Sequence, residues 1–378
     1  MSVAAGCRRA AMWVEWRSSM AMPAFTCRTL LVAFSLFACS VAEAQTSRDF
    51  KQWWVACSNV RACVAFGLPG DSGTMSAFLR ISRGGGTDAP VEILLGVPGW
   101  DTKAGDSVDA ELEAVGTDPL VRLPVKLRVS KDEVYLSQLP LESTVGLLRK
   151  AERLRVTSKG FEPAEVSLQG AMASLLWMDE QQRRVGTPTA LVARKGAEKV
   201  PAAPVPPSVR RARTPSQSGK PSTFPPAMKR NQEILECIEE VAPPEEAERV
   251  EREWLFTARL DAQNVLWGVP CGRGAYQMAH RLYLGDAKGQ ALRRAPLEAG
   301  VEPQDGEVMN SEFSPESMTL EAFAKGRGLG DCGTEHRWVW DGKRFRLLHE
   351  ATMPHCRGVP SGLWAVTYEA RLEAAGNF

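Results

Sequence analysis

The sequence has little that would place it among membrane-spanning or nucleic-acid-binding proteins. Its longest uncharged apolar run covers residues 30–42, and a transmembrane helix needs about 20 apolar residues. The formal net charge of the 378 residues is only +1, so the basic excess that favours nucleic acid as a partner is missing. With 44% hydrophobic and 24% charged residues, the composition is that of an ordinary globular protein and excludes a collagen or a mostly disordered chain.

The common motifs of metal and catalytic chemistry are also missing. No CxxC or HExxH spacing marks a zinc site, although His336, His349 and His355 lie near two cysteines. All four histidines lie at position 280 or beyond, far from residues 70–73 (GDSG), which match the segment around a trypsin-like nucleophile. Because Gly, Asp and Ser favour turns, we interpret that match as a turn. We therefore expect no catalytic residue, no metal ion, no cofactor and no enzyme activity.

The apolar run itself predicts a secretory signal peptide. It follows an arginine and ends in Ala42-Glu43-Ala44, whose small residues are typical of a signal-peptidase site. We expect residues 1–44, signal peptide and leader, to be removed on export. An alternative is lipid attachment at Cys39, because an alanine precedes this cysteine as in a lipoprotein cleavage box. The protein would contact the membrane only if Cys39 is acylated.

Cleavage after residue 44 leaves six of the nine cysteines. An even number in an exported chain indicates three disulfide bonds, although six cysteines allow 15 pairings. Cys57 and Cys63 are isolated in the first half of the mature chain, so we expect them to pair with each other. Structural bonds of this kind contribute about 2–4 kcal/mol each in the chain-entropy model. The simplest pairing in the second half is Cys237–Cys271 and Cys332–Cys356.

Composition divides the mature chain into three parts. Residues 194–230 contain eight prolines and nine Lys or Arg against one acid. Such a segment cannot bury a core, so we predict a disordered, basic, Pro-rich linker. Its net charge of +8 contrasts with −1 for residues 45–193 and −8 for residues 231–378. The linker is either a simple spacer or a basic segment that lies against the acidic domain, anionic lipid or cell-wall polymer.

Each flanking part has the pattern of a small β-rich domain. Short alternating apolar runs separated by Gly, Pro and Asp predict two antiparallel β-sandwich or barrel-like domains, so the expected fold class is mainly β with a few helices (α+β). Asp341-Gly342 predicts the tip of a hairpin. We expect a strand over residues 254–260 at the start of the second sheet. Helices are expected over residues 141–150, 170–185 and 231–241.

Two glycine-rich loops carry the candidate binding site. One surrounds Arg273, and the other runs from Lys325 to Asp331. Backbone amides in such loops can form an anion-binding nest, which cations reinforce. The alternative is that the glycines only give the chain a tight path to Cys332. On the first hypothesis, a polar groove is lined by Arg273, Lys325, Arg327 and Asp331, with Tyr276, Trp338 and Trp340 as walls.

Several blocks resemble a family of exported Gram-negative proteins, the domain of unknown function family numbered 1176. The blocks are LWGVPCGRGAY (266–276), KGRGLGDCG (325–333), WVWDG (338–342), MPHCRG (353–358), WWVAC (53–57) and RAC (61–63). The N-terminal half also resembles, more weakly, invasion-associated locus B proteins through its Trp-Cys start and residues 167–170. The family resemblance implies a periplasmic location and brings no known reaction.

Together these observations predict a non-enzymatic binding or envelope-interaction protein, whose partner is an unidentified envelope component or protein. Two other functions stay open. One is inhibition of a cell-wall hydrolase such as lysozyme. The other is hydrolysis of envelope polymers, which needs a convergent acid pair or a nucleophile with a base. A histidine within hydrogen-bond reach of a carboxylate and of a Ser or Cys in a cleft would favour this function.

Overall fold

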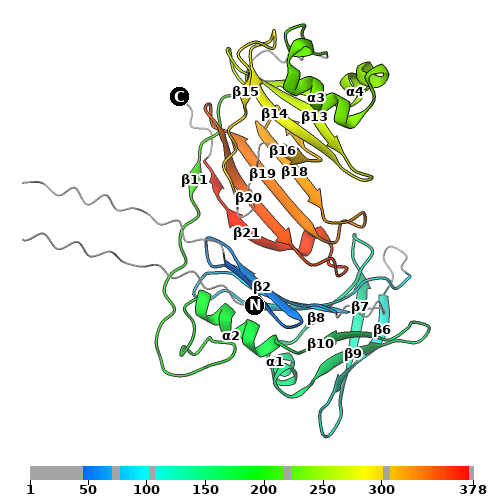
Figure 1. Cartoon of the computed structure of the whole chain (residues 1–378). Helices are drawn as coiled ribbons and strands as arrows, with labels where there is room; N and C mark the ends of the chain where they lie inside the picture. The colour runs from blue at the N-terminus through cyan, green and yellow to red at the C-terminus, as the bar shows by residue number, and fades with distance from the viewer. Residues whose placement is uncertain (1–45, 70–76, 102–106, 216–222, 301–306, 374–378) are drawn as a thin grey trace, which may run out of the picture. The chain divides into compact units, whose positions relative to one another are not determined.

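The computed structural model describes residues 46–69, 77–101, 107–215, 223–300 and 307–373 (Figure 1). The predicted signal peptide, Cys39 and the turn at residues 70–73 lie outside the described residues. The described chain consists mostly of antiparallel strands with four α-helices, which confirms the mainly β fold class. In this part of the chain no helix is long and apolar enough to cross a bilayer.

The first ten strands form one antiparallel sheet with the order β1-β2-β3-β4-β5-β8-β7-β6-β9-β10. Because side chains alternate along a strand, each strand presents one set to each face of the sheet. The strands are β1 (Thr46–Phe50), β2 (Trp53–Cys57), β3 (Cys63–Gly67), β4 (Phe78–Arg83), β5 (Val91–Val97), β6 (Ser107–Val115), β7 (Val121–Val129), β8 (Tyr135–Leu139), β9 (Arg153–Thr157) and β10 (Ala164–Ser167).

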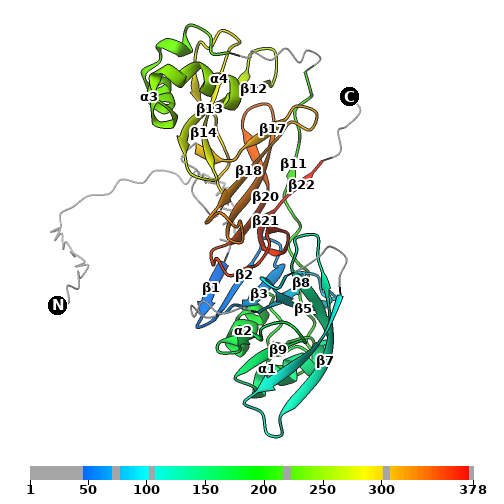
Figure 2. The same cartoon turned by 90° about the vertical axis from the view of Figure 1, so that its right-hand side faces the viewer.

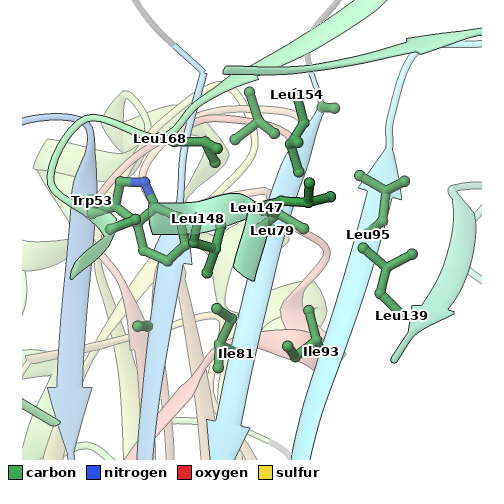
Figure 3. Close-up of a cluster of buried hydrophobic side chains, with 14 of the residues drawn as sticks. Trp53, Leu79, Ile81, Ile93, Leu95, Leu139, Leu147, Leu148, Leu154 and Leu168 are labelled. Carbon is green, nitrogen blue, oxygen red and sulfur yellow. The ribbon is translucent and has the colours of Figure 1, made fainter. Parts of the chain in front are cut away.

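Two helices, α1 (Leu141–Lys150) and α2 (Ala171–Gln181), cover one face of this sheet (Figure 1). Leu79 and Ile81 of β4 project to that face and join a buried apolar cluster with leucines of α1, shown in Figure 3. Trp53 lies in the same cluster, and its Nε1 donates a hydrogen bond to the Ser167 carbonyl at 3.0 Å. The two helices confirm the helices predicted over residues 141–150 and 170–185, although the second ends four residues early.

Arg83 of β4 is buried, and each of its three guanidinium nitrogens has a hydrogen-bond partner. Its guanidinium nitrogens donate to Asp179 Oδ1 at 2.7 Å, to Gln182 Oε1 at 2.6 Å and to the Thr189 carbonyl at 2.8 Å. The other Asp179 oxygen accepts the backbone N–H of Leu191 at 2.7 Å. A buried charge without such partners is costly, so this network fixes α2 and the chain that follows it on the sheet.

The C-terminal part contains two smaller antiparallel sheets (Figure 2). The hairpin predicted at Asp341-Gly342 is confirmed between β19 and β20. The first sheet comprises β12 (Phe256–Arg259), β13 (Val265–Arg273), β14 (Met278–Gly285), β15 (Arg293–Arg294) and β16 (Glu307–Met309). The second comprises β17 (Glu312–Ser314), β18 (Thr319–Lys325), β19 (Gly333–Trp340), β20 (Phe345–Met353) and β21 (Ala365–Glu369).

Helix α3 (Gln232–Val241) packs on β13 and confirms the helix predicted over residues 231–241. Its N-cap is Asn231, whose side-chain oxygen accepts the backbone N–H groups of residues 233 and 234. The strand predicted over residues 254–260 begins too early. Trp254 instead ends helix α4 (Ala247–Trp254), and β12 starts at Phe256. The apolar pattern of the sequence does not mark this boundary, because the strand begins only two residues after the helix ends.

All three predicted disulfides are confirmed. Cys57–Cys63 joins the facing ends of β2 and β3. Cys237–Cys271 ties α3 to β13, and Cys332–Cys356 ties the residue before β19 to the loop after β20. Each bond therefore connects two segments that lie next to each other in the fold.

The face of the ten-stranded sheet that lies away from the helices contacts residues near the C-terminal end of the chain. Trp54 and Phe66 share a buried apolar cluster with Met353 and Trp364. The side chain of Asn59 also exchanges two hydrogen bonds with the backbone of residue 369, at 2.9 and 3.0 Å. Domain boundaries at residues 193 and 231 stay predictions.

The predicted linker is described at residues 194–215 and 223–230, and these positions are not free of structure. Ser208–Val209 form strand β11, which pairs in parallel with β22 (Arg371–Leu372), as Figure 2 shows. Arg210 forms an ion pair with Glu373 at 2.5 Å, and Lys229 forms one with Glu251 at 3.1 Å. At these positions the basic segment contacts carboxylates and a strand edge of the acidic C-terminal part. Its role as a disordered linker stays a prediction.

Candidate functional site

The two glycine-rich loops lie side by side. One is the tip of the β13–β14 hairpin, and the other connects β18 to β19. Gln277 in the first loop accepts the backbone N–H of Lys325 at 2.6 Å and donates to its carbonyl at 2.9 Å. The Tyr276 ring lies over Gly328, where an added Cβ would come within 2.7 Å of the ring. The predicted convergence of the two loops is therefore present in the structure.

Arg327 and Asp331 form a structural ion pair inside the second loop. The guanidinium donates two hydrogen bonds to the carboxylate, at 2.7 and 2.5 Å, and the backbone N–H of Gly358 donates a third at 2.6 Å. Burial alone would raise the pKa of Asp331, but these hydrogen bonds outweigh burial and lower it. Each side chain is therefore the charge partner of the other, and the pair holds the loop in place.

Gly326 gives the chain a tight path to the disulfide, as the alternative hypothesis for these glycines expects. A Cβ on Gly326 would come within 2.6 Å of the Cys332 sulfur, so only glycine lets the chain pass so closely. The backbone N–H of Gly326 also donates to the Cys332 carbonyl at 2.7 Å. Gly330 has a φ of +67°, which favours glycine.

Arg273 and Lys325 rest on aromatic rings. The Arg273 guanidinium lies 5.1 Å from the centre of the Trp254 ring, and the Lys325 ammonium lies 5.8 Å from the Phe323 ring. Neither cation forms an ion pair with any residue that the structure describes. Cation–π contacts of this kind hold a charge in place while leaving its outer side open to an anion.

Two large side chains of the loops are exposed. Tyr276 is 68% exposed and Leu329 is 79% exposed. We call Arg273, Tyr276, Lys325 and Leu329 the tip surface. The expectation that Trp338 and Trp340 wall this site is wrong, since both are fully buried in the core of the second sheet. Val339, which lies between them on strand β19, is buried as well, so this end of the strand is enclosed on both faces.

The histidines do not form a hydrolytic site in the described residues. His336 contacts the Glu350 carboxylate at 3.1 Å, and the other carboxylate oxygen accepts the Thr367 hydroxyl at 2.6 Å, but this cluster is buried. His280 contacts the Ser311 hydroxyl at 3.1 Å without a carboxylate. His355 contacts an exposed aspartate at 2.8 Å. No described histidine has both a carboxylate and a Ser or Cys within reach.

Two cavities of about 520 and 300 Å³ lie over the second C-terminal sheet and share Glu321, Arg337 and His349. Arg337 and Glu321 pair with each other at 2.6 Å. Burial, followed by the nearby charge of Arg337, lowers the pKa of His349.

Cys332 and Cys356 are joined as a disulfide and cannot act as thiolate ligands. The described residues contain no group of three or more metal-ligating side chains.

Comparison with known proteins identifies the family. A family model described as a protein of unknown function (DUF1176) matches residues 47–371, so the chain belongs to this family. An uncharacterised Escherichia coli K12 protein, YpfG, is 29% identical over 346 residues, which cover 86% of this chain and 94% of YpfG. No solved structure matches the chain. The weaker resemblance to invasion-associated locus B proteins has no support in these comparisons.

Two residues that organise the site were not predicted. Gln277 and Trp254 follow or precede the glycine-rich blocks and have no sequence signature, since an amide or an indole fits many surface positions. Only the cations within the glycine-rich blocks carried a signal that sequence reasoning could use.

Proposed function

We propose that this chain is an exported, non-enzymatic binding protein of the cell envelope, and that the tip surface binds a carboxylate-bearing cell-wall polymer. Three disulfides support export, because such bonds persist in oxidising compartments. We place the mature protein in the periplasm, after removal of the predicted signal peptide. The observation that carries the binding proposal is the double hydrogen bond between Gln277 and Lys325, which fixes both loops together.

The chemistry of the tip surface favours a polymer over a lipid surface. Tyr276 and Leu329 are the exposed apolar groups of this surface. Two such side chains bury less apolar area than one myristoyl chain, which alone gives only marginal membrane binding. Arg273 and Lys325 supply two cations, each of which lies over an aromatic ring. An exposed aromatic ring on the same surface as two cations suits a polymer whose repeating units carry carboxylates.

Co-sedimentation with purified cell-wall sacculi tests the proposal. We expect Arg273→Ala/Lys325→Ala and Tyr276→Ala/Leu329→Ala each to weaken binding about tenfold or more, and added salt to weaken binding of the wild type. A matched control is Leu120→Ala/Arg122→Ala, because both residues are also exposed, and Arg122 lies on β7 of the ten-stranded sheet with Leu120 just before that strand. Unchanged binding by both tip variants would refute the proposal, as would binding to anionic vesicles but not to sacculi.

A further inference from the structure

A pocket of about 320 Å³ lies on the ten-stranded sheet beside the Cys57–Cys63 disulfide, and none of its residues belongs to the tip surface. Its volume is at the lower end of the range for small-molecule sites. The walls are largely apolar, with a few polar groups from β4 and β5. The residues that line it include Val64, Arg80, Ser82, Glu92, Trp364 and Val366.

Arg80 is largely shielded from water and only partly hydrogen-bonded. Its Nε donates to the Leu363 carbonyl at 3.0 Å, and its Nη1 donates to the Ser82 hydroxyl at 2.8 Å. The remaining nitrogen, Nη2, makes no hydrogen bond with the residues that the structure describes, and no described carboxylate forms an ion pair with Arg80. Burial lowers the pKa of Arg80, and the charge of Glu92 offsets this only in part.

Arg83 on the same strand shows what a satisfied buried arginine looks like in this protein. It lies on the opposite face of β4 and has a carboxylate, an amide oxygen and a carbonyl as partners. Arg80 lacks the carboxylate. Since a shielded guanidinium without a counterion is unfavourable, an anion that reaches Nη2 gains a charge-assisted hydrogen bond.

The surroundings of Arg80 restrict the class of anion. Glu92 stands opposite Ser82 in the β4–β5 register and is exposed at the edge of the pocket. A neighbouring negative charge disfavours a simple anion such as phosphate, but it attracts a cation on the same ligand. Trp364 and Val366 offer an apolar wall. We propose that the pocket binds a free apolar amino acid or a short apolar peptide, with its carboxylate on Arg80 and its ammonium toward Glu92.

Calorimetric titration of the wild-type protein tests the charge pattern directly. The probes are L-leucine, leucinamide, which lacks the carboxylate, and 4-methylpentanoate, which lacks the amine. We expect L-leucine to bind about tenfold or more tightly than either analogue, because only L-leucine satisfies both charges. This measurement needs no variant and therefore holds even if a substitution prevents folding.

Two substitutions assign the roles. Arg80→Gln is expected to reduce the affinity for L-leucine about tenfold or more without changing that for leucinamide. Glu92→Gln is expected to reduce the affinity for L-leucine while leaving 4-methylpentanoate unchanged or tighter. Arg122→Gln, an exposed arginine on β7, is the matched control. Tyr276→Ala/Leu329→Ala should bind L-leucine like the wild type, which separates this site from the tip surface.

Three results would overturn the inference. The first is no heat of binding with L-leucine at millimolar concentration. The second is equal affinity for L-leucine and leucinamide in the wild type. The third is an unchanged affinity for L-leucine in a folded Arg80→Gln variant.

Discussion

Gln277 holds the backbone of Lys325 with both ends of its side-chain amide, although the two residues belong to hairpins of different sheets. The pair works like one rung of a β-ladder, because a donor and an acceptor on one side meet an acceptor and a donor on the other. It therefore fixes the separation of the two loops without using any charge.

Gln277→Ala is expected to destabilise the protein by about 1–3 kcal/mol, since it leaves the Lys325 backbone groups without protein partners. Hydrogen exchange at the Lys325 amide should quicken more than the global stability loss explains. Gln263→Ala is the control, because Gln263 lies in an exposed turn. Unchanged exchange at Lys325 in the Gln277 variant would contradict the role assigned to the amide.

Substitution of Arg327 should reduce stability, whereas substitution of Arg273 should mainly reduce binding. Arg327→Ala removes two hydrogen bonds from the buried Asp331 carboxylate and is expected to cost about 1–3 kcal/mol, measured by urea unfolding. Arg273→Ala should cost less than about 1 kcal/mol, because its ring contact is exposed. The interpretation of Arg327 as structural fails if its removal changes stability no more than that of Arg273.

The same ion pair predicts a pH dependence. The pKa of Asp331 is lowered in the folded protein, so the carboxylate contributes stability that is complete above the ordinary aspartate pKa. That contribution is lost as the pH falls through the lowered pKa, below roughly pH 4. Asp331→Asn should therefore flatten the acid limb of the stability curve. An acid limb identical to that of the wild type would contradict this.

Gly326→Ala should interfere with the Cys332–Cys356 bond. The new Cβ would come within 2.6 Å of the Cys332 sulfur, and an overpacked site typically costs about 1–3 kcal/mol. Titration of free thiols in the unfolded variant, together with the melting temperature, measures both effects. Gly146→Ala in α1 is the control, since nothing lies within 4 Å of its added Cβ. If both variants behave alike, the close passage is not what selects glycine at 326.

The buried His280 predicts a second pH dependence of stability, at higher pH than that of Asp331. Burial lowers its pKa, although the hydrogen bond with the Trp254 carbonyl opposes this. A histidine with a lowered folded-state pKa contributes stability that is present above its ordinary value, roughly pH 6.5, and lost as the pH falls toward the folded pKa. His280→Gln should reduce this slope in urea unfolding between pH 7 and 5, whereas His355→Gln, which alters a more exposed histidine, is the comparison.

The disulfide pairs could be predicted because sequence spacing limits which cysteines meet. The roles of the site cations could not. Arg327 and Asp331 are four residues apart in a loop, and only the folded path shows that they pair with each other. Trp338 and Trp340 share one face of a strand that is buried on both faces at this point, and the local sequence does not show that other elements cover it. Arg80 depends on Ser82, Glu92 and a carbonyl at residue 363, and no local pattern links those positions.

The disulfide pattern has a consequence for assembly. From Cys57 onward, the six cysteines are bonded in consecutive pairs, so no bond encloses or crosses another along the chain. If the chain is exported as proposed, an oxidant that joins thiols in the order in which they leave the membrane channel would form only native bonds. Shuffling by an isomerase would then be dispensable for maturation.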